Sequence, residues 1–200
     1  MAKPSDAAQS PDGIWQDVSE AAIPTGNRFI VPTTYRTLQL DMALLRANLA
    51  QAPMEFTPAA QNSPLAMSLP LPDGRFVQFR VVESPIMEKG LAAQLPNTKA
   101  FSGIAINDPA MTIRFDISSQ GFRAMILTPG PTFLIDPYAV GDQRHYVVYN
   151  KRDAGLSKGD FNCRTEDLVR TFQPPAPSLH ESGTLRTYRL AMKERTREDG

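Results

Sequence analysis

The sequence has few of the residues from which cross-links and metal centres are built. It has one cysteine, Cys163, so no disulfide can form within the chain. It has two histidines, His145 and His180. The residues His-Glu-Ser at 180–182 begin like a zinc-peptidase motif, but no second histidine follows four residues after His180. Two zinc ligands on one helical face are therefore excluded, and the chain is predicted to have no zinc-ligand set of its own.

An excess of charge of one sign is also missing. The chain has 21 basic and 21 acidic residues, so no overall field favours nucleic acid or an anionic membrane. No apolar run reaches transmembrane length. The polar N-terminus, MAKPSDAAQSPDG, has no apolar core of a signal peptide in the sequence as given. We therefore expect no nucleic-acid partner and no membrane partner.

Motifs that carry chemistry are absent as well. There is no Walker or dinucleotide-binding glycine pattern. The aspartates in the second half of the chain lack the spacing of a calcium-binding EF-hand loop; they are Asp136, Asp142, Asp153 and Asp160. His145 lies in an apolar strand pattern beside Tyr146, which favours a structural role. The sequence thus predicts no catalytic residue, no cofactor-binding residue and no enzyme activity.

What the chain does have is the pattern of an antiparallel β-protein. It has 18 prolines, which argue against long helices. In RFVQFRVVE (75–83) alternate residues share one face, and MTIRFDI (111–117) alternates in the same way. The residues predicted to be buried are Val77, Phe79, Val81, Met111, Ile113, Phe115 and Ile117. Turn signals such as Asp73-Gly74 recur at roughly ten-residue spacing, which predicts an antiparallel β-sandwich or open barrel in up-and-down order over 75–150.

The residues before this region predict two short strands and a helix. Within 26–40, Phe29 and Val31, and then Leu38 and Leu40, are expected on inward faces. Asp41 is a credible N-cap for a short α-helix over 42–52, where apolar residues recur at helical spacing. The arginines on the strands are expected to form a solvated sheet surface; they are Arg75, Arg80, Arg114 and Arg123.

The ends of the chain differ from this region in composition. Residues 1–13 are small and polar with two prolines, which predicts disorder. Residues 151–183 are polar and proline-rich and predict a disordered linker. TLRTYRLAM (184–192) returns to a strand pattern, and KERTREDG closes the sequence with charge.

The order of several phrases resembles that of a known protein family. SLPLPDGRFVQFRVVESPIMEKGLAAQLPNTKAFSGIAINDPAMTIRFDISSQGFRAMILTPG is followed by FLIDPY and HYVVYNKRD, and is preceded by IWQDV and VPTTYRTLQLD. Together with GTLRTYRLA these phrases resemble the N-terminal propeptide of bacterial secreted zinc metallopeptidases, the reprolysin-like enzymes of the metzincin group. The resemblance covers 14–191, almost the whole chain.

This resemblance implies the domain organisation and the function. Residues 14–150 would be the β-rich propeptide domain, 151–183 a cleavable linker, and 184–200 a remnant of the first catalytic-domain strand plus a charged tail. The domain would act as an inhibitor and folding aid for a cognate catalytic domain, whose zinc would be the only metal involved. It would be a monomer, secreted or periplasmic.

The chain also departs from the family pattern. It has no signal peptide as given, no HExxHxxGxxH motif, and a charged stretch where the family continues into a folded catalytic domain. A truncated precursor, a frameshifted product and an excised prodomain are all consistent with this. The alternative is a stand-alone secreted β-sandwich that serves as a binding or adhesion module without catalytic activity.

Two features of the predicted linker bear on inhibition. Cys163 lies between the β-region and the phrase that resembles the first catalytic strand, so its thiolate could occupy the open position of the partner's zinc. The other interpretation is a free thiol without a role. Proteolytic cleavage is expected at Lys151, Arg152, Lys158, Arg164 or Arg170.

Overall fold

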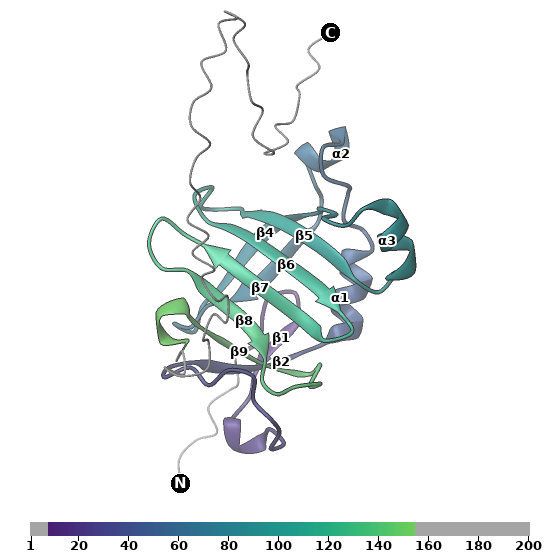
Figure 1. The fold of residues 1–200 in the computed structure, drawn as a ribbon. Coiled ribbons are helices and arrows are strands. Elements are labelled where there is room, and N and C mark those ends of the chain that lie inside the picture. The colour runs from purple at the N-terminus through teal and green to yellow at the C-terminus, as the bar shows by residue number, and fades with distance from the viewer. Residues whose placement is uncertain (1–7, 155–200) are drawn as a thin grey trace, which may run out of the picture. The chain divides into compact units, whose positions relative to one another are not determined.

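The computed structural model describes residues 8–154, in which nine strands form one antiparallel sheet (Figure 1). The strands are β1 (Trp15–Asp17), β2 (Arg36–Leu40), β3 (Ala66–Pro70), β4 (Phe76–Glu83), β5 (Lys99–Ala105), β6 (Thr112–Ser118), β7 (Gly121–Leu127), β8 (Phe133–Pro137) and β9 (His145–Asn150). The helices are η1 (Glu20–Ala22), α1 (Met42–Leu49), α2 (Pro58–Gln61), α3 (Lys89–Gln94) and η2 (Lys151–Asp153).

The sheet is a nearly closed barrel built in up-and-down order. Its strand order is β1-β2-β9-β8-β7-β6-β5-β4-β3, so from β3 to β9 each strand pairs with the next one in sequence. The predicted mainly β fold is confirmed, and of the two architectures considered the open barrel is the one observed. The turn at Asp73-Gly74 joins β3 to β4, where Gly74 has a φ of 95°, a value that glycine adopts without steric cost.

The alternating strands place their apolar faces inside the barrel. Of the seven side chains predicted to be buried, five are buried, while Val77 and Met111 are half-buried and pack against the same core. An aromatic cluster occupies the interior. Trp15 meets Phe122 edge to face at 5.4 Å between ring centroids, and Phe101 stacks on Phe115 at 5.0 Å.

Helix α1 packs its apolar side against this core. Asp41 caps it as predicted, because the Asp41 carboxylate accepts a hydrogen bond from the Leu44 N–H at 2.9 Å. Leu45 and Leu49 are both buried in the core cluster. The helix ends at Leu49, four residues before Pro53, and its length matches the prediction to within one turn.

The two edge strands of the sheet, β1 and β3, are not joined by backbone pairing. Side-chain hydrogen bonds connect these two edges instead. Arg36 on β2 forms an ion pair with Asp17 at 2.7 Å and donates to the carbonyl oxygens of Leu71 and Arg75 at 2.9 and 3.1 Å. Asp12 accepts from the Ser68 N–H of β3 at 2.6 Å. These bonds connect β1 and β2 to the β3–β4 hairpin, and they satisfy backbone groups that an open barrel would expose.

The folded part begins before Ile14, contrary to the predicted disorder of 1–13. Ser10 is buried, its N–H donates to the Trp15 carbonyl at 2.8 Å, and its hydroxyl accepts from the Trp15 N–H at 2.9 Å. Residues 8–10 thus fold back along β1, because this edge strand offers them hydrogen-bond partners. Residues 1–7 lie outside the described part.

The segment around Phe29 does not form the predicted strand. Phe29 is 79% exposed and Val31 is 57% exposed, whereas Ile30 packs toward the barrel. The segment is a loop held by Arg28, whose guanidinium lies between the rings of Tyr35 and Tyr138 at 4.8 and 4.3 Å. This anchoring, rather than period-two pairing, decides which side chain faces inward. Leu38 and Leu40 of β2 are buried as predicted.

The described chain continues for four residues past Asn150. Helix η2 is attached to the barrel, because the Lys151 N–H donates to the Thr132 carbonyl and the Asp153 carbonyl accepts from the Thr33 N–H, both at 2.8 Å. The first residues of the predicted linker therefore belong to the folded part. Residues 155–200, which hold the rest of the linker and the final strand pattern, lie outside the described part.

Candidate functional site

A groove lies on the outer face of the barrel over β4, β5 and β6. It has a volume of about 970 Å³. Its floor is formed by outward-facing residues of the three strands, and one wall is the loop of residues 53–61, which includes α2. Sheet pairing places Arg80 beside Ile104, and Val82 beside Ser102, so apolar and polar side chains share the floor. Two other hollows of the described surface are much smaller, with volumes of about 160 and 170 Å³.

The wall is fixed in place by backbone pairing with the end of β4. Residues 53–55 run parallel to this strand end, with the Glu55 N–H donating to the Glu83 carbonyl at 2.8 Å and the Glu83 N–H donating to the Pro53 carbonyl at 2.9 Å. The Thr57 hydroxyl donates to the Met54 carbonyl at 2.7 Å, which closes the turn that follows. These bonds make the wall a structured part of the groove.

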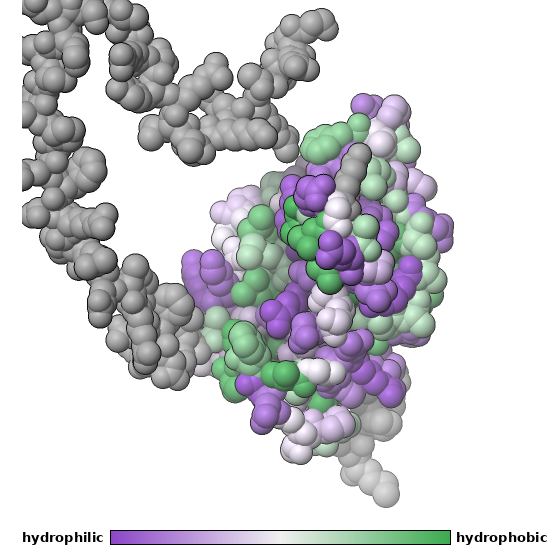
Figure 2. All heavy atoms as spheres, turned by 45° about the vertical axis from the view of Figure 1, so that its right-hand side comes forward, coloured by the Kyte–Doolittle hydropathy of each residue, from purple (hydrophilic) through white to green (hydrophobic). Residues whose placement is uncertain are grey.

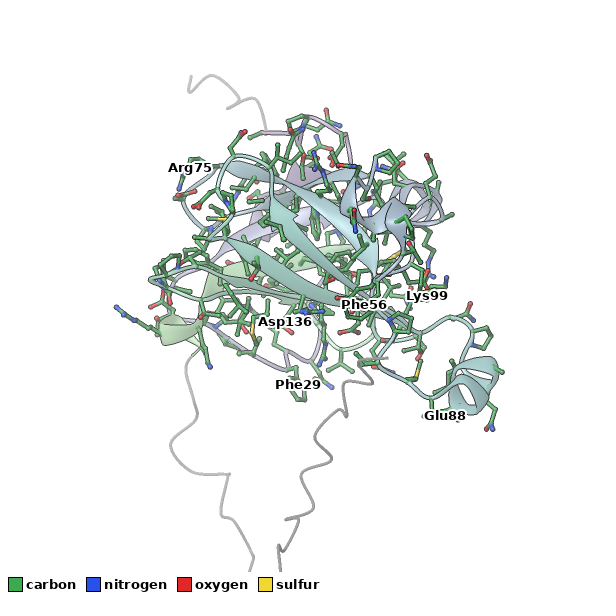
Figure 3. The ribbon with its side chains drawn as sticks, turned by 90° about the horizontal axis from the view of Figure 1, so that it is seen from above. Phe29, Phe56, Arg75, Glu88, Lys99 and Asp136 are labelled. Carbon is green, nitrogen blue, oxygen red and sulfur yellow. The ribbon has the colours of Figure 1, made fainter. Side chains whose placement is uncertain are left out.

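Phe56 stands at the top of this wall in an unfavourable backbone conformation. Its φ is 65°, in the left-handed region that bulky residues avoid, and its side chain is 84% exposed (Figure 3). Neither local propensity nor burial accounts for a phenylalanine here. A strained and exposed aromatic residue beside a groove is a feature from which a binding role can be inferred.

A polar network links the wall to the floor. The buried Ser84 hydroxyl donates to the Glu55 carboxylate and accepts from Arg114 Nη1 at 3.1 Å. The Glu55 carboxylate is thereby held by a hydrogen bond within the groove. Arg80, by contrast, forms no ion pair with any residue of the described range. Arg114 likewise forms no ion pair there, so neither groove arginine is paired with a carboxylate of residues 8–154.

The surface around these elements is mixed in character. Figure 2 shows hydrophobic and hydrophilic side chains interspersed on the face that carries the helices. Exposed apolar residues there include Ile86, Leu91 and Leu95, which come from the α3 region. Such a mixture is found both at interfaces between separately folded proteins and on ordinary protein surfaces, so it does not by itself mark a binding site.

The aspartates and His145 are engaged in local structure. His145 Nδ1 lies 2.9 Å from Asp142, whose other oxygen accepts from the Arg144 and His145 N–H groups. Burial opposes the ionisation of Asp142, but these hydrogen bonds dominate and lower its pKa. The structural role predicted for His145 agrees with this arrangement.

Asp136 belongs to a second cluster, on the outer face of β6–β9. It accepts from the Tyr149 hydroxyl at 2.7 Å and lies 3.8 Å from Arg123 Nε. Burial raises the pKa of the neighbouring Asp116, with Arg123 acting against this and Asp136 adding to it. Burial also raises the pKa of Tyr149. These side chains pack on the outer surface of the sheet, and none of them lines the groove.

The remaining predicted site residues divide between the two parts of the chain. Lys151 and Arg152 are exposed on η2, and Asp153 ends that helix. Cys163, His180, Asp160 and the cleavage candidates Lys158, Arg164 and Arg170 lie outside the described residues. Within residues 8–154 no group of three His, Cys, Asp or Glu side chains could hold a metal ion. No helix in this range is long and apolar enough to cross a membrane.

The sequence analysis did not identify the groove. All four arginines are exposed as expected, but Arg75 precedes β4 instead of lying on it, and two of the others, Arg80 and Arg114, line the groove. The available signal was the mixed outer face of RFVQFRVVE, where Arg80 and Val82 alternate with the buried positions. The role of Phe56 could not be predicted, because the neighbouring residues in the sequence indicate neither its positive φ nor the exposure of its ring.

In comparisons with protein-family models, with curated proteins and with solved structures, no match to this chain was found.

Proposed function

We propose that the barrel is the propeptide domain of a secreted reprolysin-like zinc metallopeptidase, which it binds and inhibits through its groove. The observation that carries this proposal is the groove beside the strained, exposed Phe56 on an otherwise well-packed barrel. The order of phrases that resembles such propeptides supplies the partner. The zinc belongs to that partner, and this chain acts without a cofactor.

Binding by the sheet face fits this barrel better than strand addition. An inhibitory strand would need an unpaired edge. Residues 8–10 cover the β1 edge, and Asp12 takes up the Ser68 N–H on the β3 edge. The outer face of β4–β6, in contrast, remains open for contact. Attachment to the catalytic domain by a linker would raise the effective concentration to about the millimolar range, so modest contacts would suffice before cleavage.

The test is inhibition in trans. The purified 200-residue chain is added to the reprolysin-like catalytic domains encoded by its source organism, and hydrolysis of a quenched fluorescent peptide is measured. We expect saturable inhibition of one of them, weakened at least tenfold, about 1.4 kcal/mol, by Phe56→Gly. Arg75→Gln serves as the control, because Arg75 is exposed in a turn well apart from Phe56 (Figure 3).

Two further comparisons separate the mechanisms. If Cys163 acts as an inhibitory thiol, Cys163→Ser lowers inhibition while Phe56→Gly leaves it intact. If neither the chain nor any variant inhibits or binds these domains, the propeptide function is refuted. The stand-alone binding or adhesion module then becomes the better interpretation, since it uses the same groove without a peptidase.

A further inference from the structure

The outer face of the barrel is covered in one region and bare in another. Over β9, the loop of residues 18–35 covers the outward-facing Val147 and Tyr149, which are 0% and 1% exposed. Over β5, the outward-facing Ile104 is 53% exposed. Outward-facing apolar side chains of this sheet are therefore buried where a loop covers them and exposed where no such loop is present in residues 8–154.

The bare region has an unmatched positive charge. Arg80 is the direct neighbour of Ile104 across the β4–β5 pair and forms no ion pair within residues 8–154. Arg114 lies on the other side of β5 and donates to the Ser84 hydroxyl. The one carboxylate of the groove, Glu55, accepts from the same hydroxyl. Arg114 is opposite Ser102 rather than Ile104. Arg80 is therefore the guanidinium beside the exposed isoleucine, and an incoming carboxylate would complement it.

From the juxtaposition of Arg80, Ile104 and Phe56 we propose that the groove binds an extended peptide segment of a partner protein, with apolar side chains against Ile104 and Phe56 and a carboxylate side chain paired with Arg80. The segment covers β5 in the way that residues 18–35 cover β9. This inference does not require the partner to be a peptidase, so it stands or falls separately from the proposed function.

The shape of the site favours a peptide over a lipid surface. Val82 and Ile104 lie in the floor of a concave groove, where a flat bilayer cannot reach them. The groove is lined by three adjacent strands and one wall segment on an outer sheet face, whereas sites for small amphipathic molecules enclose most of the ligand surface. An extended chain fits an open groove that crosses three strands.

The experiment uses the whole chain and an array of N-acetylated, C-amidated peptides of about ten residues, ~33 Å when extended. Four central positions sample Glu, Gln, Lys, Leu, Val and Phe in all combinations, and the best binders are measured by fluorescence anisotropy. We expect binders to carry Glu beside apolar residues. Their Kd should rise at least tenfold with Arg80→Gln or Phe56→Gly and stay unchanged with Arg75→Gln. Binding should weaken as salt rises from about 0.05 to about 0.5 M.

The alternative outcomes each overturn the proposal. Circular dichroism and thermal melting first show that the variants are folded. The proposal fails if no peptide binds, if bound peptides show no preference for Glu over Gln, or if Arg80→Gln binds like the unmodified chain. Binding to phosphatidylglycerol vesicles that depends on Arg80 and Phe56, with no peptide bound, would assign the groove to a membrane surface instead.

Discussion

Replacing Phe56 with glycine should leave the stability of the protein almost unchanged, although large aromatic residues usually cost about 3–5 kcal/mol when truncated. The side chain is 84% exposed, so its removal loses about one sixth of the ~2–3 kcal/mol that full burial would contribute, roughly 0.4 kcal/mol. The φ of 65° costs phenylalanine about 1–2 kcal/mol, which glycine recovers. Glycine in turn adds about 0.5–1 kcal/mol of backbone entropy to the unfolded chain. The net change in unfolding free energy lies within about 1 kcal/mol of zero.

A matched control isolates the contribution of backbone strain. Phe29 is 79% exposed, and its φ is not positive. Phe29→Gly therefore removes a similarly exposed ring and adds the same glycine entropy, but it relieves no strain. Its contact with Arg123, at 5.6 Å from the ring centroid, adds a small further loss. We expect Phe56→Gly to be more stable than Phe29→Gly by about 1–2 kcal/mol.

Urea unfolding of the full chain measures both variants. Trp15 is the only tryptophan and is fully buried, so its fluorescence reports unfolding of the core. The unfolding free energies of the two variants must depend on urea concentration with the same slope before their unfolding midpoints are compared. A Phe56→Gly protein that is less stable than Phe29→Gly would refute the strain argument. It would also remove the reason for treating Phe56 as a residue kept for binding.

Three other predictions use the same assay. Phe115→Ala should cost about 3–5 kcal/mol, because Phe115 is buried among aromatic rings; a loss under about 1 kcal/mol would show that its ring is not packed. Arg36→Met should cost about 1.5–3 kcal/mol, since it removes the ion-pair partner of the partly exposed Asp17 and the side-chain hydrogen bonds to the Leu71 and Arg75 carbonyls, which keep their backbone donors; Arg75→Met, which breaks only an exposed pair, should cost much less, and equal losses would argue against a closed seam. Burial raises the pKa of Asp116 above its ordinary 3.8, so its ionisation destabilises the folded state at neutral pH. Asp116→Asn should therefore stabilise the protein at pH ~7, and this advantage should fade as the pH falls through the raised pKa toward about 3.8 and be gone below it; a gain that grows at low pH would reverse the sign of this argument.

The local elements of the barrel could be read from the sequence because their causes are local. The alternation in β6 identified Ile113, Phe115 and Ile117 as the buried face. Asp41 was recognisable as an N-cap from the apolar helix pattern that follows it. The turn at Asp73-Gly74 was predictable because few dipeptides allow that reversal. In each case the residues that decide the structure are within about ten positions of one another.

The closure of the barrel and the groove depend on contacts that are distant in sequence. Alternation shows which side chains share a face, but it does not show whether the sheet curls on itself. Closure depends on Arg36 reaching the Leu71 and Arg75 carbonyls, 35 and 39 residues away. The loop near Phe29 was misjudged for the same reason, because Arg28 is held between Tyr35 and the distant Tyr138.

The candidate site is the clearest product of tertiary structure. By itself the sequence determined that Arg80 would be exposed on a strand and that its strand would alternate. It could not place Glu55 beside Glu83, and it gave no sign that Phe56 would be held at a positive φ. The position of Glu55 and the conformation of Phe56 both follow from backbone pairing between residues 53–55 and the end of β4. Such pairing depends on where the two segments meet in space, which no local preference of either segment encodes.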